Sequence, residues 1–237
     1  MPDLDISPLL RDALGVDTAV SHSDMQTDEW DADYCCNYSA DGTKLLDAEN
    51  FPDEVKVREG VKVICDGVFS FQDYMAEDVP LGRKVPDDDR VSWLDKITLP
   101  AGLTHIGREA FKECGWLRSL RLPSSLQVIG DSAFELCWSL GQISCPASLL
   151  SIGESAFSEC YSLKKAKLDK ALEIIGPYAF AYCESLEEIN LPVGLRAIGV
   201  DAFLGCRKLR RIVVAPGMKK RFAGLLPANL SRYIREA

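Results

Sequence analysis

Five cysteines of this chain recur at a constant interval of 23 residues. They belong to a phrase that recurs five times: Ile-Gly, two variable residues, Ala-Phe, two more, Cys, two more, Leu. A fixed period of this length, with apolar residues in fixed columns, predicts a solenoid in which each repeat packs only against its neighbours. The five cysteines are Cys114, Cys137, Cys160, Cys183 and Cys206.

Two apolar columns predict a short strand in every repeat, because residues two apart point to the same face of a strand. In one repeat these residues are Ile143 and Cys145, and Pro146 follows, where its missing N–H ends the ladder. The other members of the two columns are Leu120, Leu122, Ala166, Leu168, Ile189, Leu191, Ile212 and Val214.

The second half of each repeat carries a glycine after a recurring isoleucine, as at Ile152-Gly153 and Ile175-Gly176. A glycine at this place in every repeat predicts either a positive φ or a tight corner with no room for Cβ. The next segment, such as residues 131–137, has apolar residues at spacings of one and three, which predicts one or two turns of helix. Each repeat is thus expected to hold a strand, a return stretch and a brief helix.

An earlier and less regular repeat lies upstream. Its Ile64 aligns with Ile106, which lies 42 residues further along the chain. This distance exceeds the period of 23 by 19, so 19 residues are inserted between the two repeats. The insertion, at about residues 74–90, is rich in acidic side chains and is expected on the surface. The further aligned residues are Val55, Val57 and Val61 with Ile97, Leu99 and Leu103.

The repeated phrase L-x-x-I-G-x-x-A-F-x-x-C-x-x-L-x-x-I-x-L-P resembles the BspA-like leucine-rich repeat family over about residues 51–216. The segment 38–46 also resembles the hairpin that often precedes such repeats. The resemblance implies an α/β repeat fold: a right-handed solenoid with a parallel sheet on its concave side and short helical or 3-10 turns on the other. It also implies adhesion or protein interaction, often at a cell surface.

Both ends of the solenoid are expected to be capped, because terminal strands would otherwise expose open edges and bare core. Asp41-Gly42 between strand-like flanks predicts a hairpin in the N-terminal cap. The acidic residues 21–33 are expected to form a loose surface strip. The predicted organisation is an N-terminal cap over 1–50 with a short helix over 7–15, a repeat region over 51–216, and a C-terminal cap over 217–237 with an amphipathic piece over 217–226 and a last strand over 232–236.

Of the nine cysteines, the five of the repeated column are interpreted as buried free thiols, and Cys35, Cys36, Cys65 and Cys145 have no metal-type spacing. Equivalent side chains of stacked repeats lie about 4.8 Å apart, but their parallel Cβ vectors disfavour the torsion of a disulfide. The chain has no C-x-x-C pair and only two histidines, His22 and His105, both expected at the surface. The sequence therefore predicts no metal, no cofactor and no enzyme, because no nucleophile has a base and an orienting group beside it.

No apolar run approaches the roughly 18 residues of a membrane-spanning helix, and residues 1–14 do not resemble a secretory signal. These features predict a cytoplasmic protein without membrane insertion. A secreted or cell-surface location is the alternative, if a signal was removed or the export route is unconventional.

The candidate binding surface is formed by the strand side chains that point away from the core, because solenoids bind partners on extended concave surfaces. Arg121 and Arg211 are the strongest candidates, since interface hot spots favour arginine over lysine and small polar residues. The alternative is that these residues only make the sheet soluble. The full set is Lys96, Thr98, Ser119, Arg121, Gln142, Ser144, Lys165, Lys167, Glu188, Asn190 and Arg211.

A possible aromatic stripe is formed by Trp116, Trp138 and Tyr161, which occupy one column of successive repeats. Two interpretations are open: partial packing against the turns, or a platform on which a partner stacks, including a sugar.

Charge is divided unevenly along the chain. Residues 1–100 hold 23 acidic and 9 basic side chains, whereas residues 101–237 hold 13 acidic and 18 basic ones. The net charge of −9 and the absence of interleaved aromatics argue against nucleic acid as a partner. The sequence favours a monomeric, non-catalytic module that binds a protein. The alternatives are an adhesin for a host protein or glycan and a scaffold that associates weakly head to tail.

Overall fold

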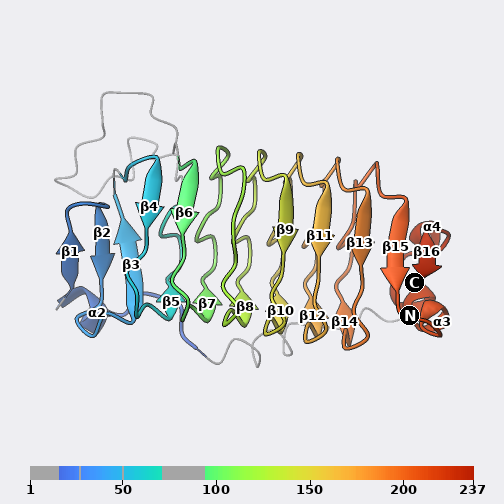
Figure 1. Ribbon diagram of the computed structural model, residues 1–237, viewed down its shortest axis with the longest axis horizontal. Helices are drawn as coiled ribbons and strands as arrows, with labels where there is room; N and C mark the ends of the chain where they lie inside the picture. Colours follow the sequence, from blue (N-terminus) through green and yellow to red (C-terminus); the bar gives the residue numbers. More distant parts are fainter. Residues whose placement is uncertain (1–15, 27, 50, 71–93) are drawn as a thin grey trace.

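The computed structural model describes residues 16–26, 28–49, 51–70 and 94–237, and it is a parallel β-solenoid of about seven turns with little helix (Figure 1). Its turns follow one another along the long axis of Figure 1, from the N-terminal strands in blue to the C-terminal cap in red. The predicted short helix over 7–15 and the insertion at 74–90 lie outside the described residues.

Three sheets are formed by the described residues. The nine-stranded sheet has the order β1 (Glu29–Asp31), β2 (Cys36–Tyr38), β3 (Lys44–Ala48), β5 (Val63–Ile64), β7 (His105–Ile106), β8 (Val128–Ile129), β10 (Ser151–Ile152), β12 (Ile174–Ile175) and β14 (Ala197–Ile198). The five-stranded sheet has the order β16 (Ile234–Glu236), β15 (Arg211–Val214), β13 (Glu188–Asn190), β11 (Lys165–Lys167) and β9 (Gln142–Ser144). A two-stranded sheet pairs β4 (Glu54–Lys56) with β6 (Lys96–Thr98).

The strand register confirms the repeat alignment. Ala166 of β11 lies opposite Ile143 of β9 in a parallel pair, one period away, and Ile64 of β5 lies opposite Ile106 of β7. In the three-residue strands β9 and β11 the middle residue is buried and its two neighbours are exposed. This alternation places one face of each strand on the core, as the spacing of two predicts.

The strand ladder on this side of the solenoid is interrupted at one repeat. Ser119–Leu122 occupy the place between β6 and β9 but form no strand (Figure 1). Within the described residues, none of the backbone hydrogen bonds involves these four residues, although Arg118 accepts one from Gly141 at 3.2 Å. The nine-stranded sheet continues past this level, because β7 and β8 are paired there.

The prediction of a brief helix in each repeat is wrong. Residues 131–136 form consecutive turns, and Ser132 and Leu136 have positive φ values of 52° and 60°, which a right-handed helix does not allow. Alternate N–H groups instead reach the next repeat: Phe134 donates to the carbonyl of Ala156 at 2.8 Å. The segment therefore bonds sideways to its neighbour, as a strand would, rather than along itself.

The recurring glycines sit in a tight corner, which is the second of the two predicted explanations. Gly176 does not have a positive φ. A Cβ built on Gly176 would lie 2.5 Å from the carbonyl carbon of Gly153 and 2.6 Å from the nitrogen of Glu154. Main-chain atoms of the preceding repeat therefore exclude any side chain at this corner.

Replacing Gly176 by alanine is expected to lower the free energy of unfolding by about 1–3 kcal/mol, because the added methyl must push apart two backbone turns. Gly141→Ala is the matched control, since its Cβ would meet only the carbonyl oxygen of Arg118 at 3.9 Å. The control is expected to change stability by less than about 1 kcal/mol. Urea unfolding of both variants tests this, and an equal loss in the two would contradict it.

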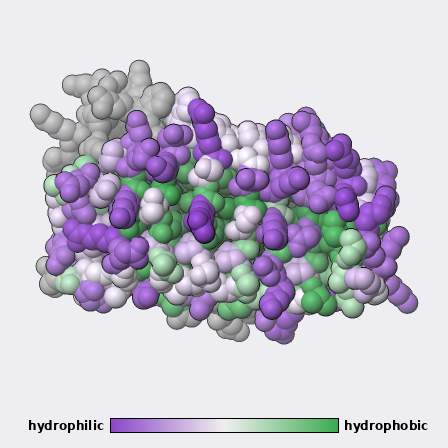
Figure 2. All heavy atoms as spheres, viewed as in Figure 1, coloured by the Kyte–Doolittle hydropathy of each residue, from purple (hydrophilic) through white to green (hydrophobic). Residues whose placement is uncertain are grey.

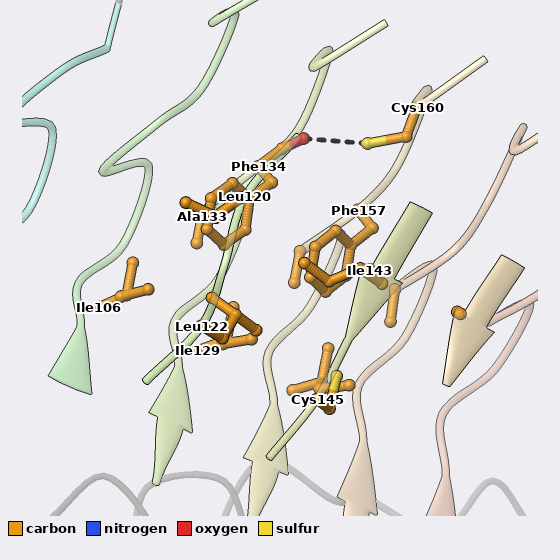
Figure 3. Close-up of a cluster of buried hydrophobic side chains, with 14 of the residues drawn as sticks. Ile106, Leu120, Leu122, Ile129, Ala133, Phe134, Ile143, Cys145, Phe157 and Cys160 are labelled. Carbon is orange, nitrogen blue, oxygen red and sulfur yellow. Dashed lines mark hydrogen bonds between the residues drawn. The ribbon is translucent and has the colours of Figure 1, made fainter. Parts of the chain in front are cut away.

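The core between the sheets is built from stacked copies of the same side chains (Figure 3). Phe134 and Phe157 lie with ring centroids 5.2 Å apart and planes at 6°. The cysteines of the repeated column are buried and unoxidised, which confirms their interpretation as free thiols. The Cys160 thiol donates to the carbonyl oxygen of Phe134 at 3.2 Å, the contact drawn in Figure 3. Each thiol thus satisfies a carbonyl of the repeat before it.

The predicted hairpin of the N-terminal region is confirmed. Strands β2 and β3 pair antiparallel, and Gly42 in the turn has φ of 68°. Residues 21–33 are not the loose strip that their acidity suggested. They contain helix α2 (His22–Gln26) and strand β1. Strand β1 is held in place because its backbone pairs with β2 and because Arg58 Nε donates to Asp31 at 2.9 Å.

The C-terminal cap contains α3 (Lys219–Leu225), α4 (Ala228–Ser231) and β16. Phe222 of α3 is fully buried, which confirms the predicted amphipathic piece, and β16 confirms the predicted last strand by pairing with β15. None of the helices in the described ranges is long and apolar enough to cross a membrane.

Candidate functional site

The predicted binding residues lie in two parallel rows, named here the strand rows, on the outward side of the strands. Those on β6, β9, β11 and Arg211 of β15 are exposed, as are Ser119 and Arg121, whereas Glu188 and Asn190 are partly buried. Figure 2 shows hydrophilic side chains spread over this face of the solenoid, with hydrophobic surface visible between them near its middle. The strands hold the rows at fixed spacing, because each row repeats with the ladder.

Both ends of the strand rows are neutralised by ion pairs between neighbouring strands. Lys96 Nζ lies 3.0 Å from Glu54 Oε2, across the β4–β6 pair. At the other end, Arg211 Nη1 lies 3.3 Å from Glu188 Oε2, across the β13–β15 pair. These side chains are exposed, so each pair contributes at most about 1 kcal/mol to stability.

Asn190 has a structural role in addition to its place in the row. Its amide oxygen accepts a hydrogen bond from the N–H of Leu168 at 2.9 Å, and its amide nitrogen donates to the carbonyl of Leu168. The side chain thereby replaces a main-chain partner at the end of β11. Its amide is therefore not free to contact a partner.

The middle of the strand rows carries basic side chains without acidic partners. Within the described residues, no ion pair involves Arg121, Lys165 or Lys167. Lys167 lies opposite Ser144 of β9, and the corresponding position of β13 is Asn190. The structure thus separates the predicted residues into paired ends and an unpaired basic centre.

One further arginine belongs to the rows, and the sequence interpretation missed it. Arg235 of β16 lies opposite Val213 of β15. It lines an open hollow of about 450 Å³ together with Arg210, Arg211 and Glu236. The signal was present in the sequence, because residues 232–236 were predicted as a last strand. Alternation along such a strand makes Arg235 the exposed neighbour of the buried Ile234.

The predicted aromatic stripe is only partly exposed. Trp138 and Tyr161 are 38% and 40% exposed, whereas Trp116 is more deeply packed. The Trp138 ring lies against Gly115 of the preceding repeat, where a Cβ would come within 2.1 Å of it. The Tyr161 hydroxyl donates to Glu159, which raises the pKa of Tyr161 to about 12. Packing therefore accounts for one face of Trp138.

The expectation that His105 lies at the surface is wrong. Its side chain is 5% exposed, because the nine-stranded sheet buries both residues of β7, as it does those of β8, β10 and β12. The ring nitrogen Nδ1 lies 2.8 Å from Thr104 Oγ1, and burial lowers the pKa of His105. His105 is thus a neutral part of the interior near pH 7.

Clusters of metal-ligating side chains and the reactivity of the buried thiols are the two remaining features of the described residues that bear on chemistry. No group of three or more His, Cys, Asp or Glu side chains there could hold a metal ion. Burial raises the pKa of Cys65 and Cys145 to about 12. Because the thiolate is the reactive form, these two thiols are inert near neutral pH.

Comparison with known proteins gives a family match. Residues 91–220 match the family model described as BspA type leucine rich repeat region, in six copies. No curated protein matches the chain at a significant level. Among solved structures, the leucine rich repeat protein of T. pallidum is similar at 26% identity and a TM-score of 0.64, over 78% of this chain and 81% of that one.

Two other solved structures are similar in fold alone. A leucine-rich repeat protein from Eubacterium ventriosum is 24% identical, with a TM-score of 0.61 over 75% of this chain and 43% of that one. The pneumococcal vaccine antigen PcpA is 17% identical, with a TM-score of 0.60 over 85% of this chain and 44% of that one. The present chain thus spans less than half the length of these two proteins.

Proposed function

Because the chain belongs to the BspA-type leucine-rich repeat family, whose model matches residues 91–220 of 237, we propose that it is a non-catalytic interaction module. It binds a protein partner through the strand rows. The observation that carries the proposal is the exposed centre of these rows, where Arg121, Lys165 and Lys167 have no ion-pair partner in the described part of the chain.

The fold supports this proposal by holding the part of the rows from β9 to β13 on paired strands. The side chains of β9, β11 and β13 stand on strands whose inward residues Ile143, Ala166 and Ile189 are buried in one core. A surface of fixed geometry loses little conformational entropy when a partner binds, so more of the contact energy appears as affinity. Long side chains at its centre supply contacts that can be desolvated on binding.

A bulky side chain placed in the strand rows is expected to block the partner without altering charge. Ser144→Trp projects an indole from the exposed side of β9 and is expected to abolish capture of the partner from source-cell lysate. Leu150→Trp is the matched control, because Leu150 is 37% exposed and lies outside the rows. The measurement is quantitative mass spectrometry of proteins retained by the immobilised full chain and by each variant.

The outcomes separate the surfaces of the molecule. Loss of one retained protein with Ser144→Trp, but not with Leu150→Trp, supports the strand rows as the binding surface. Equal retention by wild type and both variants contradicts the proposal and directs attention to the aromatic residues Trp138 and Tyr161. Circular dichroism of each variant establishes that the fold is unchanged.

A further inference from the structure

Three glutamates of the C-terminal turns form ion pairs with basic side chains. Glu184, Glu187 and Glu188 lie 3.3, 2.6 and 3.3 Å from arginines of the following repeat. Those arginines are Arg207, Arg210 and Arg211. These three arginines thus have acidic partners in the neighbouring repeat, which reduces their net positive potential.

The repeat before these turns has the opposite property. Lys164, Lys165, Lys167 and Lys170 are all exposed, and no ion pair in the described ranges includes any of them. The residue opposite Lys165 is Glu188, but its carboxylate lies within 4 Å of Arg211 instead. Positive charge therefore remains unneutralised in the middle of the strand rows.

We propose that the strand rows bind an acidic, extended segment of a partner protein, which crosses the strands between Arg121 and Lys167. This inference rests on the proposed function and adds the chemistry of the partner to it. The attraction is between the carboxylates of the segment and the unpaired lysines and arginine.

The spacing of the rows fits such a segment. Arg121 and Lys167 are two repeats apart, which is about 10 Å at the usual strand separation of about 4.8 Å. Three residues of an extended chain in the polyproline II conformation span about 9 Å and make one full turn, so the side chains at i and i+3 lie on the same face. Acidic residues at positions i and i+3 of such a segment would therefore reach Arg121 and Lys167 together, with Ser144 between them to bond polar groups of its backbone.

The surface suits a polypeptide better than a nucleic acid. No aromatic side chain stands in the strand rows, so bases would have no ring on which to stack. Hydrophobic surface is visible between the polar side chains near the middle of this face (Figure 2), where apolar side chains of a peptide can make contact. The row that contains Arg121 also alternates charged side chains with small polar ones. Of the small polar side chains, Thr98 and Ser144 can form hydrogen bonds with the amide groups of a peptide backbone. The residues of this row are Thr98, Arg121, Ser144, Lys167 and Asn190.

Fluorescence anisotropy with defined probes tests the inference on the full chain. The probe is a labelled ten-residue peptide with glutamate at every third position and serine or glycine elsewhere. A lysine-for-glutamate version and a twelve-nucleotide single-stranded DNA serve as comparisons. The acidic peptide is expected to bind at least tenfold more tightly than the other two, and to weaken as salt rises from 50 to 200 mM, because exposed charges are screened.

Charge reversal locates the site. Lys165→Glu/Lys167→Glu is expected to weaken binding of the acidic peptide at least tenfold. Lys219→Glu/Lys220→Glu makes the same change in charge on α3, outside the rows, and is expected to weaken it less than twofold. Circular dichroism of both double variants checks that they fold as the wild type does.

The inference is overturned if the acidic and basic peptides bind equally, if the DNA binds more tightly, or if the two double variants behave alike. The proposed function has a separate test in Ser144→Trp. Suppose that Ser144→Trp no longer captures the partner, whereas the charge-reversal variant and high salt do not affect capture. The strand rows then remain the binding surface, and the inference that the partner segment is acidic is wrong.

Discussion

Raising the pH from 8 to about 10 is expected to unfold this protein, because the unfolded chain can ionise thiols that the folded chain keeps protonated. Burial raises the pKa of Cys36, Cys65, Cys145 and Cys206 to about 12 and that of three further thiols well above 9. The three are Cys137, Cys160 and Cys183. In an unfolded chain a cysteine titrates near 8.5.

The direction of the effect follows from these pKa values. Because the folded pKa is the higher one, the stabilising contribution is complete below about pH 8.5 and is lost as the pH rises toward about 12. Each thiol lowers the free energy of unfolding by about 1.4 kcal/mol per pH unit in this window. Seven thiols together lower it by about 10 kcal/mol per unit, which is comparable with the whole stability of a typical protein.

Urea unfolding under a reducing agent at several pH values between about 7.5 and 10 measures this loss. Cys145→Leu is the control, because the same column holds leucine at Leu122, Leu168 and Leu191. It is expected to fold and to show a pH dependence smaller by one thiol. An unfolding midpoint that stays constant to pH 10 would contradict the prediction.

Phe157→Ala is expected to lower the free energy of unfolding by about 3–5 kcal/mol, through lost burial and the cavity left behind. The ring is fully buried and is stacked between those of Phe134 at 5.2 Å and Phe180 at 5.3 Å. Its removal breaks the stack on both sides. Because repeats are stabilised mainly by their neighbours, the loss also uncouples the two halves of the solenoid.

Tyr161→Ala, four residues further on, removes an aromatic ring that is 40% exposed and is expected to cost less than about 1.5 kcal/mol. Calorimetry of the two variants and the wild type provides the comparison. Uncoupling in Phe157→Ala should appear as a broadened or divided transition. A single sharp transition with an unchanged midpoint would show that the stack contributes little.

The sequence predicted the parts of the fold that depend on periodicity. The spacing of Ile143 and Cys145 identified the strand and its inward face, and the same columns in every repeat gave the register. For the glycine column that includes Gly176, the sequence allowed either a positive φ or a tight corner. The close backbone of the preceding repeat shows that the tight corner is the reason. A residue's own sequence neighbourhood does not contain that information.

The segments that the sequence did not predict are those whose hydrogen bonds go to another repeat. Apolar residues at spacings of one and three in 131–137 fit a helix, but the N–H of Phe134 donates to Ala156 of the next repeat. His105 was placed outward by its column, whereas the nine-stranded sheet buries both residues of β7. In both cases a partner distant in sequence determines the structure.

Part of the candidate site could have been predicted more fully. Glu188 and Arg211 occupy the same column one period apart, so their ion pair follows from the register alone. The contact of Asn190 with the backbone of Leu168 does not follow, because it depends on the end of the β11 ladder. The binding role of the strand rows remains a proposal.

The interruption at Ser119–Leu122 has a mechanical consequence. From β9 onward, three sets of backbone hydrogen bonds join neighbouring repeats: those of the nine-stranded sheet, those of the five-stranded sheet, and those of the turn segments, as from Phe134 to Ala156. Across this strip the strand ladder is missing, and the nine-stranded sheet and the turn segments, as from Phe111 to Ala133, still join the repeats. We expect the solenoid to bend more easily here than between β9 and β15, because one of the three sets of hydrogen bonds is missing. Arg121 lies in this strip, whereas Lys167 lies on the paired strand β11. A ligand bound to both side chains would therefore restrict bending of the solenoid at this place.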